Sequence, residues 1–111
     1  MKFISLSQIP ETGVSHNPEI RKKVLLKDDD VPHLTNFSRS ELLPGQTAKS
    51  HAHPDMFEVF MVESGMGRLT IDGVTKVFAT GDCVVVEPGE VHEIVNDGQE
   101  NLALLYFGIQ P

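Results

Sequence analysis

Apolar and polar residues alternate along most of the chain in short runs, and the runs end at clusters of turn residues. β-Branched residues are frequent in runs such as "VTKVF" and "CVVVE". Short runs of this kind, separated by turns about every eight to twelve residues, are typical of an antiparallel sandwich or barrel. The pattern predicts an all-β protein with strands near residues 34–42, 48–53, 57–63, 67–72, 74–79, 82–87, 91–96 and 102–109.

The turns between these strands carry sequence signals of their own. Asp72-Gly73 separates "RLTI" from "VTKVF", and these residue types accept the positive φ angles of a type I′ turn. The sequence therefore predicts a hairpin at this point. Other turn clusters contain glycines that we interpret as turn formers rather than as ligand cradles, namely Gly45, Gly65, Gly81 and Gly89.

The first 30 residues have a weaker pattern, and two interpretations of their middle part stay open. Asn17 and Pro18 would suit the cap and the first position of a short helix. The same segment would equally serve as a loop that leads into a strand at "KVLL". The three aspartates at 28–30 are expected to form a solvated turn.

The segment "HAHPDMFEV" contains two histidines and a glutamate whose spacing does not suit one strand. His51 and His53 are two residues apart, so they would share a face of a strand. Glu58 follows at an odd spacing and would point to the opposite face if the strand were continuous. Pro54-Asp55 favours a turn and interrupts the ladder. We therefore expect a new strand after this break, with Glu58 facing the two histidines.

The strand predicted after this break is apolar on both faces. Phe60 and Val62 would share the face of Glu58, and the residues that alternate with them in "FEVFMVE" are mostly apolar too. A strand of this kind is usually covered on both faces. In a short chain this predicts either a packed second sheet or a subunit partner, and we expect a homodimer.

A third histidine has a similar setting later in the chain. In "GEVHEIVN", His92, Ile94 and Asn96 would share one face of a strand. Three imidazoles and one carboxylate form a suitable nitrogen and oxygen ligand set for a metal ion. The candidate metal ligands are His51, His53, Glu58 and His92.

Length and charge restrict the classes of protein that fit. We expect one domain over 1–111, with an N-terminal extension and first strands in 1–33 and a barrel in 34–109. The net charge of −7 argues against nucleic acid as a partner, because phosphate binding needs clustered cations. No apolar run suits a membrane span or a signal peptide, and the single cysteine permits no intrachain disulfide. These features predict a cytoplasmic protein.

The residues around the first two histidines match a known sequence motif. The first cupin motif is written as glycine, five residues, His-x-His, three or four residues, glutamate, six residues and glycine. The chain follows this spacing from Gly45 to Gly65.

The second cupin motif is written as glycine, five residues, Pro-x-Gly, two residues, histidine, three residues and asparagine. The chain follows it from Gly81 to Asn96, except that Pro88 lies one place late and Glu87 holds the usual position of the proline. The chain therefore resembles the cupin family, and in particular a small single-domain microbial cupin. The motifs cover 45–96, and the flanking strands extend the likeness to nearly the whole chain.

This resemblance implies a fold and a metal site. The fold is a double-stranded β-helix, or jelly roll, made of two antiparallel sheets. The matching His51, His53, Glu58 and His92 would bind one divalent transition metal, with Fe, Mn, Ni and Zn all open. The family includes dioxygenases, isomerases, decarboxylases, hydrolases, storage proteins and sugar-binding domains, so the resemblance does not specify the reaction.

The ligand set itself suggests what the site would bind. Three neutral imidazoles and one carboxylate around a divalent ion leave one net positive charge, which favours a small oxygen-rich organic anion. Phe60, Val62 and the "VVV" run are expected to supply apolar walls. A metal-dependent dioxygenase is the leading interpretation, beside a non-redox isomerase or lyase and a non-catalytic binding protein. A tetrahedral zinc that is closed to ligands would instead be structural.

Four other residues of chemical interest have simpler interpretations. His16 and His33 lie next to turn signals and are expected at the surface. Cys83 is interpreted as a small buried apolar residue rather than as a nucleophile. Tyr106 lies on the last predicted strand, and the sequence leaves open whether it points into the barrel or outward.

Overall fold

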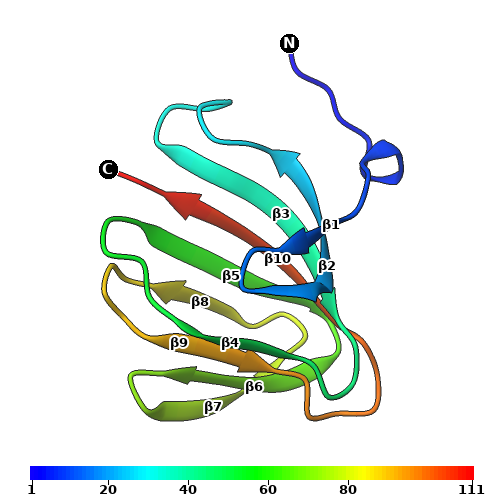
Figure 1. Cartoon of the computed structure of the whole chain (residues 1–111), viewed down its shortest axis with the longest axis vertical. Helices are drawn as coiled ribbons and strands as arrows, with labels where there is room; N and C mark the ends of the chain where they lie inside the picture. The colour runs from blue at the N-terminus through cyan, green and yellow to red at the C-terminus, as the bar shows by residue number, and fades with distance from the viewer.

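The computed structural model describes residues 1–111, which form ten strands and one short 3₁₀-helix (Figure 1). No helix in it combines the length and the apolar content that crossing a membrane requires. The helix η1 spans Leu6–Gln8, and the strands are β1 (Thr12–Val14), β2 (Asn17–Leu26), β3 (Leu34–Leu42), β4 (Thr47–His51), β5 (Phe57–Ser64), β6 (Met66–Ile71), β7 (Val74–Ala79), β8 (Cys83–Val86), β9 (His92–Val95) and β10 (Leu102–Ile109).

The strands form two antiparallel sheets. One sheet has six strands in the order β1-β2-β3-β10-β5-β8, and the other has four in the order β4-β9-β6-β7. Neighbours in a sheet are often distant in the sequence, since β3 pairs with β10 and β4 pairs with β9. The chain thus crosses repeatedly between the sheets, as in a jelly roll. This confirms the predicted all-β fold of two antiparallel sheets.

The predicted strands between 34 and 109 are all present, and their turns have the expected backbone. Asp72 and Gly73 have φ angles of 47° and 81°, as the hairpin between β6 and β7 requires. The other four turn glycines, Gly45, Gly65, Gly81 and Gly89, also have positive φ. The largest difference is in β4, which ends at His51 rather than at residue 53.

The short helix that the sequence allowed from Asn17 is not formed, and that alternative is wrong. Asn17 instead begins β2, which pairs with β3 from Arg21 to Leu26. Ile20 on this strand is only 1% exposed and joins the core. Sheet pairing and burial outweigh the weak cap signal here, because most of a strand's stability comes from its neighbours. The aspartates at 28–30 form the expected turn.

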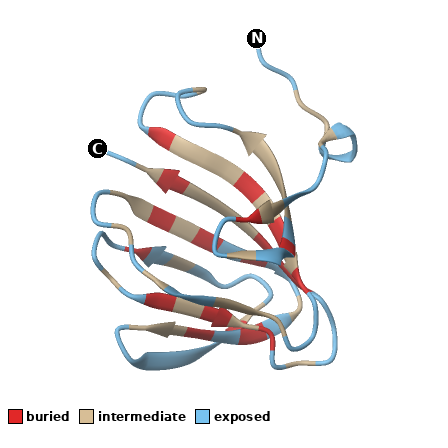
Figure 2. Cartoon of the chain, viewed as in Figure 1, coloured by how far each residue is buried: buried red, intermediate tan, exposed pale blue.

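The core lies between the sheets, and buried positions recur along the strands of both of them (Figure 2). On β5, Glu58, Phe60 and Val62 are buried as predicted. On the opposite face of β5, Met61 is 44% exposed. The second sheet therefore covers only the inner face of β5, and within this chain the outer face stays partly open.

Asn96 is the last residue of the second motif, and its side chain is buried in the core. It is 1% exposed, and its side-chain amide donates to the carbonyl oxygens of Leu42 and Glu100 at 2.9 and 2.8 Å. Its Oδ1 accepts a hydrogen bond from the backbone N–H of Gly98 at 3.0 Å. Asn96 thus satisfies backbone groups that would otherwise be buried without partners. It holds β9 and the loop after it against the end of β3.

Candidate metal centre

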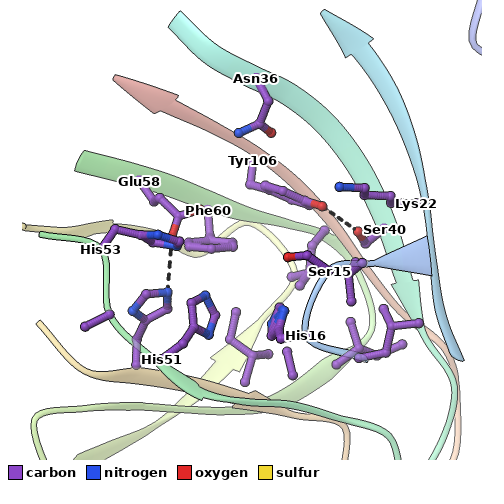
Figure 3. A pocket seen from close by; sticks show the side chains of 18 of the residues that line it. Ser15, His16, Lys22, Asn36, Ser40, His51, His53, Glu58, Phe60 and Tyr106 are labelled. Atoms are coloured by element: carbon purple, nitrogen blue, oxygen red, sulfur yellow. Dashed lines mark hydrogen bonds and ion pairs between the residues drawn. The ribbon is translucent and has the colours of Figure 1, made fainter. Parts of the chain in front are cut away.

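Four polar side chains converge inside the barrel from both sheets (Figure 3). His51 is the last residue of β4 and lies opposite His92 on β9 in the sheet register. His53 lies in the loop after β4, and Glu58 reaches in from β5 in the other sheet. The possible ligand atoms of all four lie within 4.8 Å of one another. The structure therefore brings the whole candidate set together in a group that could hold a metal ion.

The loop after β4 makes this convergence possible. Pro54 and Asp55 form an exposed bend between His53 and β5, as the sequence predicts. The carbonyl oxygen of His53 accepts a hydrogen bond from the N–H of Gly89 at 2.8 Å. Gly89 belongs to the second motif and has a φ of 83°. A backbone hydrogen bond thus joins the two motifs next to the ligands.

Backbone carbonyls orient two of the imidazoles. The Nδ1 atom of His51 lies 2.8 Å from the carbonyl oxygen of Lys49, and that of His92 lies 3.1 Å from the carbonyl oxygen of Glu90. A carbonyl oxygen can only accept, so Nδ1 carries the hydrogen in both rings. In the neutral rings the lone pair is then on Nε2. This is the tautomer that a metal ligand held by its second nitrogen needs.

Two buried atoms at the centre lack a satisfied hydrogen bond. Oε1 of Glu58 lies 3.1 Å from Nε2 of His92 and 3.1 Å from Nε2 of His53. Neither Glu58 Oε1 nor His92 Nε2 has a hydrogen-bond partner of acceptable geometry. A buried polar group without a partner costs about 1–3 kcal/mol. A cation among these atoms would be coordinated by both and remove that cost, so the residues fit a metal ion.

The protonation equilibria of the imidazoles agree with this interpretation. Burial lowers the pKa of His51, and the neighbouring His92 and His16 lower it further, so this ring favours its neutral form. Burial also opposes the charge on His92, but contact with Glu58 and the carbonyl of Glu90 outweighs burial and raises its pKa. Glu58 thus attracts a positive charge, which a metal ion would supply in place of a proton.

The ligand group lies at one end of a cavity of about 390 Å³. Phe60, Ile94 and Leu104 are among its apolar walls. The expected contribution of Val62 and of the "VVV" run at 84–86 is wrong, because these valines do not line the cavity. Val62 and Val86 are buried in the core, Val84 packs against it, and Val85 is exposed on β8. The apolar walls come instead from Phe60 on β5, from β9 and β10, and from the first three strands.

Tyr106 points into this cavity, which settles the orientation that the sequence left open (Figure 3). Its hydroxyl lies 3.0 Å from Oγ of Ser40, and its ring stacks on Phe60 with centroids 5.3 Å apart. Burial raises the pKa of Tyr106, although the hydrogen bond to Ser40 opposes this effect. The phenol is therefore neutral near pH 7 and can donate a hydrogen bond into the cavity.

His16 is a site residue that the sequence did not reveal. It is exposed as predicted, but it lies at the turn between β1 and β2 and lines the cavity. Its ring centroid is 4.2 Å from that of His51. Burial and the neighbouring His53 lower its pKa, so the ring favours its neutral form. No local signal predicts this contact, because it depends on how the first hairpin folds over β4.

The structure separates two other residues from the site. His33 is exposed, as predicted, and its Nδ1 lies 3.1 Å from the carbonyl oxygen of Gln110. Cys83 is exposed, so its interpretation as a buried residue is wrong. On β8, Val86 is buried and Val84 half-buried. Cys83 alternates with them along the strand and lies on the outer face of the sheet.

Comparison with known proteins gives the same fold family. The family model for the cupin domain matches residues 38–108. An oxalate-binding protein of Thermotoga maritima is 32% identical over 69 residues, which cover 62% of this chain and 57% of that protein. A gentisate 1,2 dioxygenase of Aquipseudomonas alcaligenes is 32% identical over 86 residues, which cover 72% of this chain and 25% of that protein. The chain thus spans little more than half of the first relative and a quarter of the second.

The likeness extends to the whole fold of a solved structure. A crystal structure of a predicted oxalate decarboxylase from Thermotoga maritima aligns with a TM-score of 0.91 and 25% identity. The alignment covers 99% of this chain and 100% of that chain. The strands before residue 38, which the family model does not match, therefore also have counterparts in a similar fold.

Proposed function

The chain belongs to the cupin family, and from this we propose that it binds one divalent transition-metal ion and, at that ion, a small organic carboxylate. The observation that carries the proposal is the pair of buried atoms, Glu58 Oε1 and His92 Nε2, that lack partners at the centre of the ligand group. The proposed metal ligands are His51, His53, Glu58 and His92.

The charge balance of the site supports an anionic ligand. The chain has a net charge of −7, so an anion needs a local reason to bind. Three neutral imidazoles and the Glu58 carboxylate would leave a net charge of +1 around a divalent ion. Attraction to that charge is stronger in a cavity with apolar walls than in water, because the effective dielectric constant is lower.

The relatives support the ligand class. Oxalate and gentisate, which the names of the two relatives specify, are both small organic carboxylates. Both relatives are longer than the aligned segment, so for this chain their activities are proposals. Iron, manganese, nickel and zinc are all compatible with a ligand set of imidazole and carboxylate. When bound, such an ion supplies Lewis-acid catalysis, and a redox-active one also supplies oxygen chemistry.

Two catalytic functions each have a relative in their favour. The similarity to a gentisate dioxygenase favours an oxygenase, which is our leading catalytic proposal. The similarity to a predicted oxalate decarboxylase favours a lyase instead. In either case this chain would orient the carboxylate against the imidazoles and exclude water with Phe60 and Leu104. At the far end of the cavity, the neutral hydroxyl of Tyr106 could donate a hydrogen bond to a ligand that extends beyond Phe60.

The experiment that tests this proposal uses the unmodified protein. We expect metal analysis to find one divalent ion per chain, and oxalate to perturb the spectrum of protein loaded anaerobically with Fe²⁺. Oxygen is then admitted while oxygen uptake and carbon dioxide release are followed. Oxygen uptake with gentisate as the added carboxylate would support the oxygenase, and carbon dioxide release from oxalate without uptake would support the lyase. A spectral change without turnover would leave a binding protein, and no spectral change with oxalate or other small carboxylates would refute the open site.

We also propose a cytoplasmic location and no nucleic-acid partner. The single cysteine supports the first, because secreted domains of this size often depend on disulfides. The net charge of −7 supports the second. Fractionation of cells that express a tagged chain would test the location.

A further inference from the structure

A second group of polar side chains lies in the same cavity, away from the metal ligands. Lys22 on β2, Ser40 on β3 and Tyr106 on β10 all line the cavity and lie close together (Figure 3). The Tyr106 and Ser40 hydroxyls are 3.0 Å apart. Either hydroxyl can donate to the other, and the pair keeps one hydrogen to offer a ligand.

Lys22 is the one lysine or arginine that lines the cavity. It is half-buried, and it takes part in none of the salt bridges of the chain. Its Cα lies opposite that of Ser40 in the register of β2 and β3. Lys23, the next residue, instead donates to the carbonyl oxygen of Leu6 at 3.1 Å. Lys22 is thus a cation without an acidic partner at the wall of the cavity in which we propose that an anion binds.

The ring of Phe60 separates the group of Lys22, Ser40 and Tyr106 from the candidate metal ligands. The Phe60 ring lies between them, with its centroid 6.0 Å from that of His92 and 5.3 Å from that of Tyr106. A two-carbon anion held by the metal would not span this ring, whereas a longer chain would pack on it. The cavity volume of about 390 Å³ also has room for a larger ligand.

We propose that Lys22, with the hydroxyls of Tyr106 and Ser40, forms a second anion-binding subsite, so that the cavity takes an organic dianion. One end of this ligand is a 2-hydroxy or 2-oxo carboxylate that chelates the metal, and the other end is a second carboxylate. A short apolar chain between them lies on Phe60. The inference rests on the proposed function, because the first end uses the metal.

Lys22 lies outside the part of the chain that the family model matches. The match to the family model begins at residue 38, and Lys22 lies before it on β2. His16, which also lines the cavity, lies before it as well. The strands that precede the matched region therefore supply the charge that would select among carboxylates, while the matched region supplies the metal ligands.

The test measures binding by calorimetry on the metal-loaded chain, with three probes. The affinity for oxalate measures binding at the metal end of the cavity alone. The five-carbon 2-hydroxypentanedioate carries the second carboxylate, and 2-hydroxypentanoate has the same number of carbons without it. We expect the diacid to bind about tenfold more tightly than the monoacid, as for one charge-assisted hydrogen bond in a partly exposed site. The Lys22→Met variant should lose this preference and keep its metal content and its affinity for oxalate.

The neighbouring Lys23→Met variant is the matched control and should keep the preference, because Lys23 donates to Leu6 on the other side of the strand. Equal affinity of the unmodified protein for the two five-carbon acids would overturn the inference without any variant. A preference that survives in Lys22→Met would overturn the role of Lys22. If oxalate binds while the second carboxylate adds nothing, only this inference fails. If no probe binds to the metal-loaded chain, the proposed function fails as well.

Discussion

At the scale of single residues, the candidate site depends on a few donor atoms that the backbone orients. Lys49 and Glu90 contribute only their carbonyl oxygens, yet these determine which nitrogen of His51 and of His92 faces the centre. The choice of tautomer therefore depends on the backbone at positions 49 and 90. The imidazole and carboxylate side chains of the candidate ligands cannot be exchanged for others, because each supplies an atom to the same small volume.

We predict that His53→Ala combined with His92→Ala abolishes stoichiometric metal binding. Two of the four donors are lost, and the remaining pair leaves most of the coordination shell to water. Metal analysis of protein dialysed against trace metal provides the measurement. His33→Ala is the control, since His33 is exposed and outside the site, and should leave the content unchanged. One tightly bound ion per chain in the double variant would show that the assignment is wrong.

Tyr106 gives a prediction that needs no metal. It is the only tyrosine of the chain, and burial raises its pKa above the usual value of about 10. The ultraviolet titration of the phenol should therefore lie above that of a free tyrosine. Because the folded pKa is the higher one, the stability due to the neutral phenol is complete below the unfolded pKa and is lost as pH rises through the folded pKa. Ser40→Ala removes a hydrogen bond that lowers this pKa and should move the titration still higher. A normal titration curve would contradict the buried position.

At the scale of the elements, the turns hold the strands in the register that the site requires. Gly65 connects β5 to β6 and Gly45 lies between β3 and β4, and both have similar positive φ angles, 91° and 87°. Their surroundings differ. A Cβ atom at position 65 would overlap the backbone carbonyl oxygen of Asn101, whereas one at position 45 would meet nothing within 4 Å.

This pair predicts unequal effects of the same substitution. Gly45→Ala should cost about 1–2 kcal/mol, which is the cost of the left-handed backbone alone. Gly65→Ala should cost more, about 3 kcal/mol or above, because the backbone must also shift away from Asn101. Chemical denaturation of the two variants measures the difference. Equal losses of stability would mean that the turn at Gly65 relaxes freely.

At the scale of the whole molecule, the outer face of the six-stranded sheet carries an apolar surface. Met61 on β5 and Val85 on β8 are 44% and 54% exposed, and Val85 pairs with the half-buried Val59. These three residues form a surface that we call the outer patch. Exposed apolar residues on adjacent strands often mark an interface between subunits. The homodimer expected from the apolar "FEVFMVE" strand stays a prediction, and the outer patch gives it a location.

We predict that the protein is a dimer at concentrations on the order of tens of micromolar, and that Met61→Glu combined with Val85→Glu converts it to a monomer. The new charges would be buried in the interface without partners. Light scattering gives the mass, and Val77→Glu on β7 is the control, because Val77 is as exposed as Val85 but lies on the other sheet. A monomer in the unmodified protein would contradict the prediction.

The sequence by itself determined the features that depend on neighbouring residues. Asp72-Gly73 predicts its hairpin because few other residue types accept those φ angles. The alternation in β5 and β9 places Glu58 and His92 in the interior because side chains of a strand point to opposite faces in turn. The break at Pro54 and the spacing of both motifs were enough to assemble all four candidate ligands. That residues 1–111 form one domain stays a prediction.

Only the tertiary structure decided the rest of the site. His16 packs on His51, and Lys22 reaches the cavity, because the first hairpin joins the sheet beside β3 and extends over β4. The inward position of Tyr106 and the outward position of Cys83 depend on the register of β10 and β8. A shift of one residue in register moves every side chain of a strand to the other face. Register is set by pairing with strands that are distant in the sequence, so no local pattern contains it.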